Sequence, residues 1–177
     1  MKEKLFEMFP EFSLFKNEEL KQKTMNVFVK AMDTGGWQPE DLVEMPFTLL
    51  IKPCPANMVQ HIRGVTLVSY KSALELKEIY GDKMDIDMDE LLCGAILHDI
   101  GKLLEYVKEN GEFVKSSYGK LLRHPFSGMA LAFEEGLSPK VQHMIAVHAR
   151  EGEKSRVCAE SIIIHHADFT NFEPLKL

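Results

Sequence analysis

From Asn57 to near the end of the chain, apolar residues recur at the spacing of an α-helix, and capping residues bracket each run. In the first run, Ile62, Val65 and Val68 share one face. Gly81 then ends it. Little of this part alternates with a period of two, so the sequence predicts an all-α fold with no sheet carrying the core. Helices are expected over residues 57–80, 87–98, 124–136, 138–148 and 156–172.

The first third of the chain has a weaker pattern. Residues 1–34 predict one or two short amphipathic helices, which Pro10 interrupts. The short apolar run 45–51 fits a helix or a strand equally well. We therefore divide the chain into a mostly helical extension, residues 1–55, and a helical bundle, residues 56–177. The extension has no group of residues that we could convert into chemistry.

Length and charge narrow the class of protein. The 177 residues suit one domain with its own core, and 45% hydrophobic with 27% charged residues is ordinary for a globular protein. The formal net charge is -6. An acidic chain can still bind a phosphate ester locally, but no broad basic surface for duplex nucleic acid is expected.

Cysteine spacing and the N-terminus bear on the compartment. Cys54, Cys93 and Cys158 form no C-x-x-C pair, so we expect reduced thiols and neither a thiolate zinc site nor a disulfide framework. The first residues are charged throughout, unlike a signal peptide. No apolar run approaches the ~20 residues of a transmembrane helix. The sequence predicts a cytoplasmic protein with no membrane partner.

A histidine and an aspartate stand together where an apolar helix is expected to end. Burying the carboxylate of Asp99 beside His98 is costly unless something pairs with it, and a divalent cation is the simplest partner. Mixed imidazole and carboxylate ligands suit zinc, iron, manganese or nickel. Taken singly, each histidine of the chain is more often a hydrogen-bonded core group than a ligand. Asp99 could also be a cap.

The segment His98-Asp99-Ile100-Gly101-Lys102 resembles the H-D-I-G-K signature of the HD superfamily of metal-dependent phosphohydrolases. The resemblance extends from Met58 to Asp168. In that superfamily an upstream histidine, the His-Asp pair and a distant aspartate bind metal. His61, His98, Asp99 and Asp168 occupy these positions in order. The resemblance implies an HD-type helical bundle with these four ligands.

A subset of the superfamily binds two metals with two further histidines. His124, within an H-P-x-x-G element, and His148 are similar to those positions. The resemblance therefore implies two divalent transition-metal ions bridged by Asp99, of manganese, iron, nickel or zinc. Residues 118–168 are also similar to the HD domain of certain 3′–5′ exoribonucleases. The chain lacks the paired histidines and G-Y-P element of the cyclic-dinucleotide phosphodiesterases, so that specificity does not carry over.

Further candidates lie close to these ligands in the sequence. Related enzymes place the lysine at Lys102 near the scissile phosphate, and we expect Gly101 to let the chain turn there. Arginine side chains could also bind the phosphate, and the candidates are Arg123, Arg150, Arg156 and, more weakly, Arg63. For any one of them, a solvated surface position is the more common role. His165 and His166 lie just before Asp168 in the sequence. They either line the site or orient Asp168, or they are ordinary helix residues. His143 is left out of the site.

The resemblance predicts hydrolysis of a small phosphate ester, with a nucleotide as a candidate, by metal-activated water. Asp99 and Lys102 are the expected catalytic residues. Asp99 would bind metal and orient the water, and the positive charge of Lys102 would offset the negative charge that develops on the phosphate during the reaction. A diiron oxygenase is the alternative, because some HD relatives use the same ligands with dioxygen. A non-catalytic sensor is disfavoured because the full ligand set is present. The sequence predicts neither the oligomeric state nor a role for residues 1–55.

Overall fold

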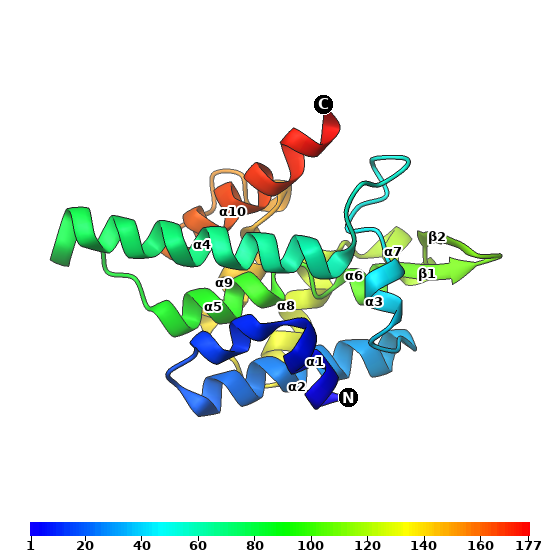
Figure 1. Ribbon diagram of the computed structural model, residues 1–177, viewed down its shortest axis with the longest axis horizontal. Coiled ribbons are helices and arrows are strands. Elements are labelled where there is room, and N and C mark those ends of the chain that lie inside the picture. The colour runs from blue at the N-terminus through cyan, green and yellow to red at the C-terminus, as the bar shows by residue number, and fades with distance from the viewer.

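The computed structural model describes residues 1–177 and is helical apart from one short hairpin (Figure 1). The helices and strands, with η for 3₁₀ turns, are α1 (Lys2–Met8), η1 (Pro10–Leu14), α2 (Glu18–Gly35), α3 (Asp41–Glu44), α4 (Met58–Tyr80), η2 (Gly81–Lys83), α5 (Met88–Leu97), α6 (Lys102–Glu105), β1 (Tyr106–Glu109), β2 (Glu112–Lys115), α7 (Ser117–Leu121), α8 (His124–Glu134), α9 (Pro139–Val147), η3 (Arg150–Gly152), α10 (Ala159–Phe172) and η4 (Glu173–Lys176). The predicted all-α class is confirmed.

The five long helices expected after residue 56 are α4, α5, α8, α9 and α10, and local sequence explains where they begin. Asn57 caps α4, and Gln60 completes a reciprocal capping box with it. Asp87 accepts two backbone N–H bonds at the start of α5, and the Ser138 side chain caps α9. These caps satisfy N–H groups that helix ends would otherwise leave without partners.

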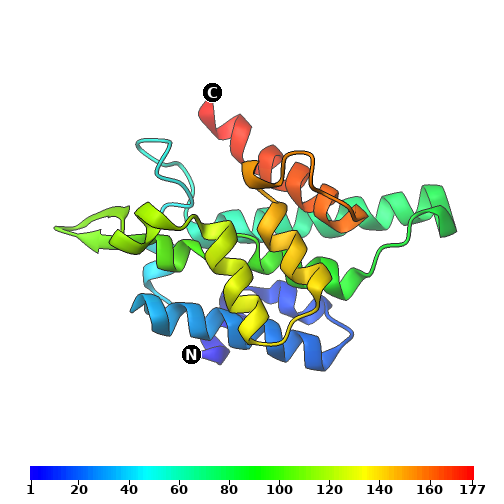
Figure 2. The ribbon, with the colours of Figure 1, turned by 180° about the vertical axis from the view of Figure 1, so that it is seen from behind.

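Helix α5 is the centre of the bundle. Every residue from Leu91 to Leu97 is buried, as expected for a helix that is apolar all round. It packs against α2, α4, α9 and α10. Figure 1 shows α4 crossing the molecule above α5, and Figure 2 shows α8 and α9, in yellow and orange, crossing the opposite face. The C-terminal end of α5 therefore lies where several helices meet.

The N-terminal segment belongs to the same hydrophobic core. Helix α2 is longer than the short helices predicted, and the Thr24 hydroxyl donates to Cys93 Sγ of α5 at 3.1 Å. The Trp37 indole N–H donates to the Leu103 carbonyl at 2.7 Å. A single cluster of 35 buried residues draws on both parts of the chain. The division at residue 55 remains a prediction. None of the helices combines the length and the apolar character that crossing a membrane requires.

The sequence interpretation missed a β-hairpin. The segment around Gly111 lies between the helices expected from the sequence, where no strand was predicted, yet β1 and β2 pair antiparallel there, with Tyr106 opposite Lys115. Asn110 and Gly111 both have positive φ, 52° and 83°, as a two-residue hairpin turn of this kind requires. Asn-Gly is a strong hairpin signal, so this connection was predictable. The base of the hairpin lies next to the site described below.

Candidate metal centre

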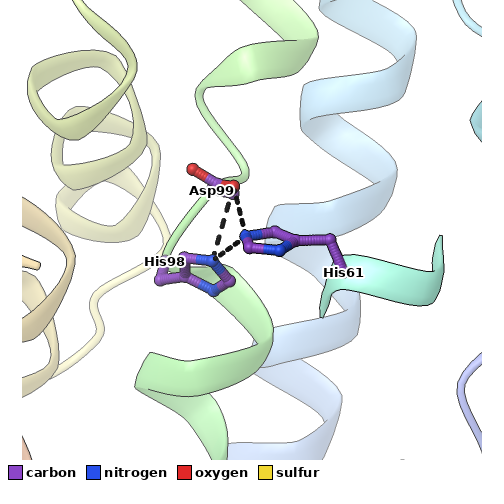
Figure 3. A group of neighbouring side chains, drawn as sticks. All are labelled: His61, His98 and Asp99. Atoms are coloured by element: carbon purple, nitrogen blue, oxygen red, sulfur yellow. Dashed lines mark hydrogen bonds and ion pairs between the residues drawn. The ribbon is translucent and has the colours of Figure 1, made fainter. Parts of the chain in front are cut away.

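Asp99 lies in the turn between α5 and α6, and its two carboxylate oxygens face two different groups of histidines. Oδ2 lies 3.3 Å from His61 Nε2 and 3.4 Å from His98 Nε2 (Figure 3). Oδ1 lies 3.2 Å from His124 Nε2 and 3.5 Å from His148 Nε2. All five side chains are buried. One carboxylate thus joins two sets of nitrogen atoms.

The first group also includes the C-terminal aspartate. His61 is in the first turn of α4, and its Nε2 lies 3.3 Å from His98 Nε2 and 3.2 Å from Asp168 Oδ1 of α10. In the second group, Nε2 of His124, at the start of α8, lies 3.2 Å from that of His148, after α9. The fold therefore brings together all six metal ligands expected from the sequence.

Hydrogen bonds on the far side of three rings fix which nitrogen faces the centre. His98 Nδ1 lies 2.6 Å from the Ala95 carbonyl oxygen, and His148 Nδ1 lies 2.7 Å from that of Ile145. His124 Nδ1 lies 2.9 Å from Glu105 Oε2. Because these oxygens only accept, we assign the proton to each Nδ1 and a lone pair to each Nε2. The lone pairs of these three rings and the carboxylates cannot bond one another, so this donor set fits cations.

The ionisation of the site agrees with this assignment. Burial lowers the pKa of His124 to about 4, so its ring is neutral at neutral pH. Burial opposes ionisation of Asp99, but the charge of Lys102 and the nearby histidines hold its pKa well below the ordinary value. His61 differs from the other rings: its Nδ1 has no partner, and against burial its hydrogen bonds with Asp168 and Asp99 raise its pKa. The same bond with His61 lowers the pKa of Asp168 to about 2 against its burial. Anionic carboxylates and a neutral imidazole are the forms that bind metal.

Lys102 is a buried cation beside the carboxylate. Its Nζ donates to Asp99 Oδ2 and to the Phe47 carbonyl oxygen, each at 2.6 Å. Burial acts to lower its pKa, but Asp99 outweighs this effect and raises the pKa above the ordinary value. Lys102 is therefore charged, and it lines the cavity that reaches the site.

Glu105 belongs to the site but was missed from the sequence. Its Oε2 accepts hydrogen bonds from both the ring and the backbone N–H of His124, the latter at 2.7 Å. Its Oε1 pairs with Lys115 Nζ at 3.0 Å. Burial would raise the pKa of Glu105, but the bonds with His124 lower it to about 2. A carboxylate next to the apolar pair Leu103-Leu104 is a signal that it needs a partner, although nothing in the sequence identifies that partner.

Phe47 was also missed, and it comes from the ambiguous run 45–51. Its ring stacks on His61 with centroids 4.3 Å apart. Figures 1 and 2 both show the loop between α3 and α4 projecting beside the C-terminal end of the chain. The N-terminal segment therefore supplies one wall of the site.

A cavity of about 360 Å³ opens onto Asp99, His124 and Asp168. Its lining is rich in cations, namely Lys102, Lys115, Arg123, Arg150 and Lys176. It also contains four aromatic rings, those of Phe47, Tyr106, Phe169 and Phe172. The carboxylates of Asp99, Glu105 and Asp168 also line it, so the five cations exceed the three acidic groups, and in an acidic chain this local excess of positive charge favours a small anionic ligand.

The remaining cationic candidates lie outside the cavity. Arg156 Nη2 donates to the Ala149 carbonyl oxygen at 2.6 Å, and Arg63 Nε pairs with Glu11 at 2.9 Å. Both contacts are structural.

The remaining histidines do not contact Asp168 by hydrogen bonds. His165 Nδ1 lies 2.7 Å from the His148 carbonyl oxygen, and the His166 side chain is exposed. His143 Nε2 accepts the Val157 N–H, away from the centre.

Gly101 is needed for a reason other than the one expected. Its φ is -65° and its ψ is -14°, a conformation open to any residue, so the turn does not require glycine. A Cβ atom there would lie 2.1 Å from the His124 carbonyl oxygen and 2.7 Å from the Gly128 backbone nitrogen. The glycine lets α8 approach closely enough to bring His124 to Asp99.

Gly101→Ala is expected to lower the free energy of unfolding by about 1–3 kcal/mol, because the clash is with backbone atoms that must move. Urea denaturation measures the change. The matched control is Gly64→Ala within α4, where the added Cβ meets only the end of the Asn171 side chain. Equal stability of the Gly101→Ala variant and wild type would show that α8 is not held close at this point.

Sequence comparison identifies the family to which this site belongs. A family model described as the HD domain matches residues 58–170. The matched segment contains all six of the candidate ligands. The chain belongs to the HD domain family.

Two curated proteins resemble the chain over much of this segment. A dihydroneopterin 2′,3′-cyclic phosphate phosphodiesterase from Methanocaldococcus jannaschii is 31% identical over 115 residues, covering 63% of this chain and 45% of that protein. A ribonuclease Y from Pseudothermotoga lettingae is 30% identical over 94 residues, covering 53% of this chain and 16% of that protein. The chain thus spans less than half the length of either relative. No solved structure gives a significant match.

Proposed function

We propose that the protein is a metal-dependent phosphohydrolase that hydrolyses a small phosphate ester, with a nucleotide as the leading candidate. The observation that carries the proposal is Asp99, whose two oxygens face two histidine groups at the floor of a cation-lined cavity. The relatives support the same chemistry, since one is a phosphodiesterase by name and the other a ribonuclease. The cavity volume of about 360 Å³ suits a small substrate.

The donor set favours two divalent transition-metal ions. His61, His98 and Asp168 would hold one ion, His124 and His148 the other, and Asp99 would bridge them. Bound there, the ions would lower the pKa of a water molecule and polarise phosphoryl oxygens. Manganese, iron, nickel and zinc all suit these ligands.

The chain's own residues then bind and orient the ester. Asp99 accepts a hydrogen bond from the Lys102 ammonium at 2.6 Å. The Lys102 ammonium offsets negative charge that develops on the phosphoryl group. Arg123 and Arg150 line the cavity, and Arg150 has no ion-pair partner in the chain. Their guanidinium groups are suited to holding phosphate oxygens at its mouth.

Lys102→Ala is expected to lower turnover by on the order of 10²-fold while leaving the metal content intact, because a transition-state charge contact is lost. Steady-state rates and elemental analysis of the same preparation measure both quantities. Lys120→Ala, on the exposed side of α7, is the matched control and should behave as wild type. Unchanged turnover in the Lys102 variant would assign this lysine a purely structural role.

The proposed function is tested with a generic aryl phosphodiester and a panel of nucleotides, measured by released phenol and phosphate. Metal-loaded protein is expected to hydrolyse the aryl ester and at least one nucleotide, and chelation should abolish both reactions. The proposal fails if no ester is hydrolysed at any metal loading. A visible absorption band in aerobically purified, inactive protein would instead indicate bridged iron and the oxygenase chemistry that these ligands also suit.

A further inference from the structure

The cavity has an apolar aromatic wall that the hydrolytic groups do not use. Phe169 and Phe172 follow Asp168 on α10, and all three side chains line the cavity. Phe172 is four residues after Asp168, so the two share a face of the helix. The helix that supplies a metal ligand thus places aromatic rings next to it.

No aromatic neighbour stacks in parallel on either ring, although His165 lies tilted against Phe169 with centroids 4.6 Å apart. The Phe172 ring is nearly perpendicular to that of Phe47, with centroids 5.9 Å apart, and to that of Phe169, with centroids 6.5 Å apart. Phe169 and Phe172 are both half-buried. The Lys176 ammonium lies over the Phe172 ring, 3.8 Å from its centroid. A flexible, exposed lysine on a ring face marks a face that a flat ligand can reach by displacing it.

The wall has few side chains that could recognise the edge of a heterocycle by hydrogen bonds. No Asn, Gln or Ser side chain lines the cavity, and its hydroxyl groups are those of Tyr106 and of Thr48, which already accepts the Leu50 N–H at 3.2 Å. The other residues from this loop, Leu49 and Leu50, are apolar. A ring bound here would be held by its face, and stacking on an aromatic side chain tolerates many different bases.

The same cavity has a separate place for phosphate. Lys115, Arg123 and Arg150 line it together with Asp99, and Arg150 forms no salt bridge, whereas Lys115 pairs with Glu105 and Arg123 with Glu151. Its volume of about 360 Å³ suits one ring with one phosphorylated sugar or side chain. The lining thus combines aromatic side chains, which suit a flat ring, with cationic side chains, which suit a phosphate group of the same ligand.

We propose that Phe169 and Phe172 form a subsite for a flat nitrogen heterocycle carrying a phosphate ester, held by stacking with little discrimination between rings. The phosphate lies toward Asp99 and Asp168. A nucleobase and a pterin share this chemistry. The inference rests on the proposed function for the orientation of the phosphate, but the ring subsite itself is a matter of binding.

Calorimetry on metal-loaded protein tests the subsite, with phosphate release followed on the same samples so that the heat of binding is separated from any heat of turnover. Ribose 5-phosphate is the matched ligand without a ring, and AMP is expected to bind at least about tenfold more tightly because of stacking. GMP, CMP and UMP are expected to bind within a few-fold of AMP. The double variant Phe169→Leu with Phe172→Leu should bind AMP no more tightly than ribose 5-phosphate. Phe133→Leu, an exposed ring elsewhere on α8, is the control.

Two outcomes overturn the proposal. Equal affinity of wild type for AMP and ribose 5-phosphate overturns it, and so does a double variant that loses both ligands equally. A pterin phosphate that binds more tightly than AMP identifies a pterin ring, and the reverse identifies a nucleobase. Either result upholds the subsite. If AMP binds as expected but no ester is hydrolysed, the subsite stands and the hydrolase proposal fails.

Discussion

Replacing Asp99 with alanine is expected to remove both bound metal and hydrolytic activity. No other side chain faces both histidine groups, so one substitution takes an oxygen ligand from each. Elemental analysis and aryl phosphodiester hydrolysis, on protein shown to be folded by circular dichroism, measure the two losses. Asp99→Asn, which keeps the shape but not the charge, should lose most of both.

The ion pair between Asp99 and Lys102 determines how Asp99→Ala changes the free energy of unfolding. From the sequence alone, removing a buried carboxylate would be expected to stabilise the metal-free protein. The structure reverses this expectation, because Asp99→Ala leaves the buried Lys102 ammonium without its partner, at a cost of about 3–5 kcal/mol. Adding Lys102→Met should recover much of that loss. Full metal content or wild-type turnover in Asp99→Ala would show that the centre lies elsewhere.

The double variant His124→Ala with His148→Ala is expected to lose one metal ion and most of its phosphodiesterase rate. The remaining ligands, His61, His98 and Asp168 with Asp99, are sufficient for one ion. Metal content per chain and the rate on the aryl phosphodiester are measured on the same sample. His143→Ala with His166→Ala is the matched control, since neither ring faces the centre.

The double variant also separates the two chemistries that these ligands suit. Loss of one ion together with a collapsed phosphodiesterase rate supports a two-metal hydrolase and weakens the oxygenase alternative. Wild-type metal content and rate would instead mean that the site binds a single ion. His124 and His148 would then be buried histidines satisfied by Glu105 and the Ile145 carbonyl.

Much of the fold was predictable because its signals are local. Helical periodicity and caps such as Asn57 and Ser138 depend on residues a few positions apart, and they placed the long helices within a few residues. The order of candidate ligands came from the resemblance to a family. The resemblance also implied that Asp99 bridges two ions, and the structure adds the geometry, with one carboxylate oxygen toward each histidine group.

The unpredicted features of the site depend on contacts between distant segments. Glu105 meets His124 across 19 positions, and Lys102 meets the Phe47 carbonyl oxygen across 55. No local pattern specifies such partners. Gly101 illustrates the same limit, because its requirement comes from the approach of α8 and not from its own dihedral angles. The Asn-Gly hairpin is different, since its signal was local and was overlooked.

The most direct test of the metal centre is elemental analysis of wild-type protein purified without chelator. The arrangement of Asp99 between two histidine groups predicts two transition-metal ions per chain. Protein that contains no transition metal as purified, and takes none up when soaked in manganese, iron, nickel or zinc, would contradict the account.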